Sequence, residues 1–80
     1  MLEKIKNAKY AVGVKQSTKL VNADSVATAF VARDAQDKVT VPFVRLCGQK
    51  GVPVEYADTM EALGKACGIE VGAAIAVIIK

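Results

Sequence analysis

The side chains best suited to chemistry in this chain lie in the segment Gly13-Val14-Lys15-Gln16-Ser17-Thr18-Lys19. Lys15 and Lys19 are four residues apart, a spacing that places two side chains on one face of a helix, and Gln16 would share the same first turn. Lysine donates to guanine acceptors, and an amide can make paired hydrogen bonds to a base edge. The segment therefore has the chemistry of a nucleic-acid contact, and a merely solvated helix start is the alternative that it leaves open.

A second stretch, Gly68-Ile69-Glu70-Val71-Gly72, places apolar side chains between two glycines. One interpretation is a helix-to-strand connection in which Ile69 and Val71 are half-buried. The other is an apolar lid over unstacked bases, because sequence-specific RNA recognition favours splayed single-stranded nucleotides. Glu70 would repel phosphate, so we expect it to point away, toward a lysine or a backbone N–H.

The charge of the chain is concentrated near its N-terminus. The formal net charge is +3, but residues 1–19 hold five lysines and one acid, so they carry +4 and the other 61 residues carry −1. Such a concentration marks either a polyanion-binding face or a solvated lysine-rich face. Arg33 and Lys65 are additional candidates for phosphate contacts, which position RNA without reading its sequence. A residue of this kind is more often an ordinary exposed basic residue, and that alternative stays open for both.

Several classes of function find no support in the residues present. The chain has no histidine, which removes the commonest general base and zinc ligand. Cys47 and Cys67 do not form a Cys-x-x-Cys pair, and the Gly-x-x-x-x-Gly-Lys phosphate loop is absent. We therefore expect no enzyme, metal or cofactor. With few cysteines, no signal peptide and no apolar run long enough for a bilayer, we expect a cytoplasmic protein that does not contact membranes.

The hydrophobic pattern alternates between helical and strand-like segments over a single domain, residues 1–80. Strands are predicted over 10–14, 26–32, 54–56 and 73–79, and helices near Leu2 and Ile5, over 15–22, from Thr40 to Gly51 and from Asp58 to about Cys67. In these helices Asn22 would be a C-terminal cap, Thr40 an N-cap with Pro42 in the first turn, and Asp58 with Glu61 a capping box. This order predicts an α/β fold, a three-layer α/β/α sandwich. About four strands would form its sheet, with helices on both faces and the two longest apolar runs in the middle.

The chain resembles the ribosomal-protein L7Ae/L30e family over nearly its whole length, and within it the small bacterial YbxF-like branch. The segments that carry the resemblance are residues 13–19 and Leu63-Gly64-Lys65-Ala66-Cys67-Gly68-Ile69-Glu70-Val71. The resemblance implies a protein that binds kink-turn RNA, a helix bent at a three-nucleotide bulge followed by tandem sheared G·A pairs. Archaeal and eukaryotic members usually carry Asn-Glu where this chain has Lys15-Gln16.

By that resemblance, Gly13, Lys15, Gln16 and Lys19 would lie against the guanines of the G·A pairs. The loop formed by Gly68, Ile69, Glu70 and Val71 would cover the bulged nucleotides. We therefore expect a monomeric, non-catalytic RNA-binding protein whose partner is a kink-turn in the ribosome or another ribonucleoprotein. The alternative is a protein-interaction or structural module of a ribonucleoprotein, with only nonspecific affinity for RNA.

Overall fold

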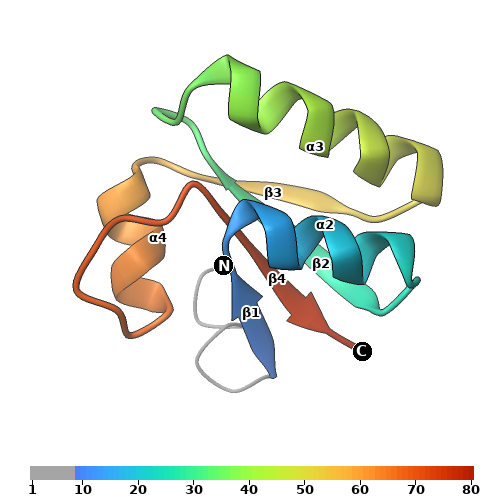
Figure 1. The fold of residues 1–80 in the computed structure, drawn as a ribbon. Coiled ribbons are helices and arrows are strands. Elements are labelled where there is room, and N and C mark those ends of the chain that lie inside the picture. The colour runs from blue at the N-terminus through green and yellow to red at the C-terminus, as the bar shows by residue number, and fades with distance from the viewer. Residues whose placement is uncertain (1–8) are drawn as a thin grey trace.

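The computed structural model describes residues 9–80, so the helix expected near Leu2 and Ile5 lies outside the described residues. Within residues 9–80 the chain forms four strands and three helices (Figure 1). In chain order these are β1 (Tyr10–Val12), α2 (Val14–Asn22), β2 (Val26–Ala32), α3 (Asp37–Lys50), β3 (Val54–Ala57), α4 (Met60–Ala66) and β4 (Ile75–Ile79). The predicted alternation of helices and strands is confirmed for this part of the chain.

The four strands form one mixed sheet in the order β1-β4-β2-β3. β4 runs antiparallel to both of its neighbours, β1 and β2, and β2 runs parallel to β3. The two longest apolar runs, β2 and β4, occupy the centre as expected. Among residues 9–80, no helix has the length and apolar character needed to cross a membrane.

Two separate cores explain why the central strands are apolar on both faces. Phe30 and Ile78 belong to a buried cluster with α4, whereas Val31 and Val77 belong to a cluster with α2 and α3. Successive side chains of a strand point to opposite faces of its sheet, so both faces of β2 and β4 are covered. The fold is thus the expected three-layer sandwich, with α2 and α3 on one face and α4 on the other (Figure 1).

The start of α3 was predicted wrongly. The helix begins at Asp37 rather than after Thr40, with Gln36 in extended conformation as its N-cap. Asp37 places a carboxylate in the first turn, where it complements the helix dipole. Pro42 consequently lies in the interior of the helix, where it lacks the N–H that would bond to the carbonyl of Lys38. The other end agrees with the prediction, because Gly51 is a left-handed C-cap with φ of 71°.

Two further caps lie next to their predicted positions. The N-cap of α4 is Thr59 and not Asp58, because the Thr59 hydroxyl accepts a hydrogen bond from the Ala62 N–H at 3.0 Å. After α2, the left-handed residue is Asp24, with φ of 57°, and not Asn22, which is still helical. Gly68 ends α4 as predicted, with φ of 76°.

Candidate nucleic-acid interface

Three backbone hydrogen bonds bring the candidate segments to one end of the sheet. The Gly13 N–H donates to the Ile75 carbonyl at 3.0 Å, so the start of α2 lies beside the start of β4. The Ala32 N–H donates to the Ala74 carbonyl at 2.9 Å, and the Arg33 N–H donates to Ala57 at 2.9 Å. The start of α2, the ends of β2 and β3, and the last residues of the loop that leads into β4 therefore share this end (Figure 1).

The first turn of α2 is open to an anion. Gly13 precedes the helix with φ of 109° and ψ of 152°, a backbone conformation that is essentially restricted to glycine. The N–H groups of the first turn have no acceptor within the helix, and no acidic residue occupies this turn. These donors and the helix dipole together favour a negatively charged partner.

Lys15, Gln16 and Lys19 line a common hollow on the surface of α2. The hollow has a volume of about 420 Å³, and Leu20 also lines it. All three polar side chains are exposed. We call this surface the α2 hollow. Its two ammonium groups and one amide could donate hydrogen bonds to base edges and phosphates together.

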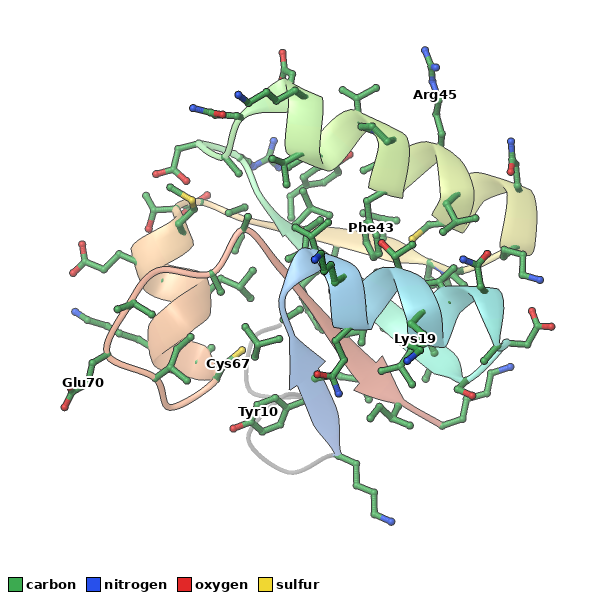
Figure 2. All side chains as sticks on the ribbon, viewed as in Figure 1. Tyr10, Lys19, Phe43, Arg45, Cys67 and Glu70 are labelled. Carbon is green, nitrogen blue, oxygen red and sulfur yellow. The ribbon has the colours of Figure 1, made fainter. Side chains whose placement is uncertain are left out.

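The two apolar residues of the 67–74 loop have different environments. Ile69 is half-buried and packs against the core cluster of α4, whereas 71% of Val71 is exposed. Each interpretation of the sequence thus describes one of the two side chains: Ile69 is a packing residue and Val71 forms an apolar tip. Glu70 is exposed and points outward (Figure 2).

Close packing against α4 holds this loop in place. A Cβ atom at Gly64 would overlap the carbonyl oxygen of Val71, so the loop lies directly on the helix at a position where only glycine fits. The Ile69 N–H donates to the Gly64 carbonyl at 3.1 Å, and the Ala73 N–H donates to the Met60 carbonyl at 3.0 Å. Both ends of the tip are therefore attached to α4.

Tyr10 connects this loop to the strand that leads into α2. Its hydroxyl donates to the Cys67 carbonyl at 2.5 Å, across 57 positions of sequence, and the two residues are neighbours in Figure 2. Sequence reasoning missed both Tyr10 and Gly64. A glycine inside a helical pattern costs about 1 kcal/mol and so could have signalled a close approach at position 64. No local pattern signals the Tyr10 contact.

Arg33 and Lys65 do not join the α2 hollow. The Arg33 guanidinium lies over the ring of Tyr56 on β3, 5.1 Å from its centroid. The Lys65 ammonium lies 3.2 Å from the Glu61 carboxylate, one helical turn earlier, and both side chains are largely exposed. The sequence-predicted site is thus divided into the α2 hollow, the loop tip, and two basic residues engaged elsewhere.

Comparison with known proteins assigns the chain to a family. The family model for the ribosomal protein L7Ae/L30e/S12e/Gadd45 family matches residues 2–80. The chain belongs to this family. An RNA-binding protein of Bacillus pumilus is 46% identical over 67 residues, which cover 84% of this chain and 82% of the relative. The RNA-binding protein YbxF of Geobacillus stearothermophilus is 34% identical over 79 residues, covering 98% and 96% of the two chains.

A solved structure of an RNA-binding protein agrees with the fold. The Giardia lamblia 15.5kD RNA binding protein superimposes with a TM-score of 0.89 at 28% identity, covering 99% of this chain and 70% of that one. The YbxF-like resemblance seen in segments 13–19 and 63–71 is therefore confirmed.

Proposed function

We propose that this protein is a non-catalytic RNA-binding protein that recognises kink-turns. The observation that carries the proposal is the α2 hollow, where Lys15, Gln16 and Lys19 line one surface of a helix that begins beside Ile75, a short distance along the chain from the exposed Val71. Relatives over most of the chain are named RNA-binding proteins. The hollow supplies polar donors and the loop tip supplies an apolar surface.

The α2 hollow and the loop tip would contact different parts of the RNA. Lys15 and Gln16 would donate to the acceptors that guanines of G·A pairs present in a widened groove, since a glutamine amide and an ammonium both match those acceptors. Lys19 and the free N–H groups of the first turn would bind nearby phosphate. Val71 would pack on an extruded base of the bulge, because unstacked bases are held by apolar and aromatic contacts.

Two alanine substitutions test this assignment. Gln16→Ala and Lys15→Ala should each weaken binding to a kink-turn duplex by roughly 1–3 kcal/mol. Gln16 and Lys15 are exposed, so both variants should keep the thermal stability of the parent protein. Binding is measured by isothermal titration calorimetry.

Matched controls exist on the same chain. Gln49→Ala removes an exposed amide near the end of α3, and Lys80→Ala removes a charge at the other end of the sheet. Both controls should bind like the parent protein. If Gln16→Ala and Lys15→Ala bind as tightly as their controls, the α2 hollow does not read the RNA.

A further inference from the structure

Both arginines of the chain line one groove outside the α2 hollow. Arg33 and Arg45 are the two arginines in the sequence, and they border a groove of about 350 Å³ between α3 and the strands β2 and β3. Asp37 and Tyr56 also line it, and the valines at positions 31, 41 and 44 supply apolar surface. We call this surface the arginine groove. It combines cations, one carboxylate, an aromatic ring and apolar surface.

The pair of Arg33 and Tyr56 is arranged as a stacking platform. The guanidinium lies 5.1 Å from the ring centroid, a cation–π contact, and 40% of Tyr56 remains exposed. A guanidinium stacked on an aromatic ring can hold a base against its plane, and its N–H groups can still reach phosphate oxygens. The backbone N–H of Arg33 donates to the Ala57 carbonyl, which holds the Arg33 backbone beside the end of β3.

The arginine groove begins at the same end of the sheet as the α2 hollow. Val14 and Thr18 of α2 face Lys38 and Pro42 of α3 across a shared depression, so the two helices start side by side. Lys38 is exposed at the start of α3. Lys38 is the basic side chain among those that line this depression, which lies between the start of α2 and the start of α3.

We propose that the arginine groove is a second RNA contact, which takes single-stranded nucleotides that continue from the RNA bound at the α2 hollow. This inference rests on the proposed function. A base stacks on the Arg33–Tyr56 pair, Arg45 binds a phosphate, and the Asp37 carboxylate accepts from an exocyclic amino group of a base. An acidic peptide fits less well, because it offers no base to stack on the Arg33–Tyr56 pair.

The test compares two RNAs. One is a kink-turn duplex, and the other is the same duplex with a single-stranded tail of about eight nucleotides, within the length that such surfaces contact. The tail is placed on each strand end in turn. The parent protein should bind one tailed RNA several-fold more tightly than the duplex, as measured by fluorescence anisotropy. A 5-iodouridine in that tail should crosslink to Tyr56 under ultraviolet light.

Variants assign this gain to the groove. Arg45→Gln and Tyr56→Leu should abolish the gain from the tail and leave duplex binding unchanged. Tyr56→Phe keeps the ring and should keep the gain, and so should Lys80→Gln, which removes a charge at the far end of the sheet. Arg45→Gln should also reduce the magnitude of the slope of log K against log salt for the tailed RNA. The expected reduction is about 0.7, the contribution of one single-strand phosphate contact.

The outcomes separate this inference from the function on which it rests. If the parent protein binds the duplex but gains nothing from either tail, or if Arg45→Gln keeps the gain, the arginine groove is not an RNA contact. If the parent protein does not bind the duplex, the proposed function fails and this inference fails with it.

Discussion

The three polar side chains of the α2 hollow differ in what they could recognise. Gln16 carries both a donor and an acceptor, so it can distinguish base edges, whereas Lys19 carries only donors on a flexible stem. Their exposure means that each can be changed without disturbing a core. Substitutions at this surface should therefore change the affinity for RNA without changing the free energy of unfolding.

Lys19→Gln should reduce the salt dependence of RNA binding. If Lys19 neutralises one phosphate of a duplex, its loss lowers the magnitude of the slope of log K against log salt by about 0.9. Gln16→Ala, which removes no charge, should leave the slope unchanged. Titrations at several salt concentrations measure both slopes. Equal slopes for Lys19→Gln and the parent protein would show that Lys19 contacts no phosphate.

The two thiols make the stability of the fold sensitive to alkaline pH. Cys47 and Cys67 are buried, and desolvation raises the pKa of each thiol above its ordinary value of 9.0. As the pH rises above 9, thiols of the unfolded chain lose protons while those of the folded chain keep them. The free energy of unfolding should therefore fall as the pH rises from about 8 to about 10.

Denaturant unfolding at these two pH values measures that fall. The control is the double variant Cys47→Ala/Cys67→Ala, which keeps every other ionisable group of the chain. It should be less stable at both pH values but should lose less stability between them. If the double variant loses as much as the parent protein, ionisation of the thiols does not contribute.

At the scale of elements, the 67–74 loop depends on α4 for its position. Replacing a glycine by alanine inside a helix normally stabilises it by up to about 1 kcal/mol. At Gly64 the added Cβ would overlap the Val71 carbonyl, and overpacking of this kind typically costs about 1–3 kcal/mol. Gly64→Ala should therefore lower the free energy of unfolding, displace Val71 and weaken RNA binding.

Gly48→Ala is the matched control for this prediction. Gly48 lies within α3, and an added Cβ there meets no atom within 4 Å apart from the neighbouring backbone of its own helix. It should raise or maintain the melting temperature and leave RNA binding unchanged. Equal stability of the two variants would mean that the loop moves away from α4 at no cost.

Tyr10→Phe tests the connection between β1 and the loop. The change removes one hydroxyl that donates to the Cys67 carbonyl, worth about 0.5–1.5 kcal/mol of stability. Amide hydrogen exchange in residues 67–72 should become faster, and RNA should dissociate faster, while Tyr56→Phe should change neither. Unchanged exchange in this loop would show that Tyr10 does not position it.

The elements also show what local sequence signals could and could not predict. The central strands were predictable because both faces of β2 and β4 are covered, which leaves continuous apolar runs. The helix caps were displaced by one to four residues because neighbouring polar residues, such as Asp58 and Thr59, carry nearly the same signal. In the structure the Thr59 hydroxyl accepts from the Ala62 N–H, and the Asp34 carboxylate, distant in sequence, accepts from the N–H of Met60 at 2.8 Å.

At the scale of the whole molecule, the sheet assembles a site from segments distant in sequence. Gly13 and Ile75 meet through a hydrogen bond, and this pairing follows from β1 and β4 being neighbours in the sheet. The polar residues of the α2 hollow were recognisable from their spacing. Strand order was not, so neither the different environments of Ile69 and Val71 nor the engagement of Arg33 by Tyr56 could be predicted.

The central claim is that the α2 hollow and the loop tip together recognise a kink-turn. The most direct test is a calorimetric titration of the protein with a short kink-turn duplex in moderate salt with magnesium. The control is the same duplex with its G·A pairs replaced by Watson–Crick pairs. We expect tight binding to the first RNA and much weaker binding to the second. Equal, weak binding to both would show that the lysines act only through charge and would contradict the claim.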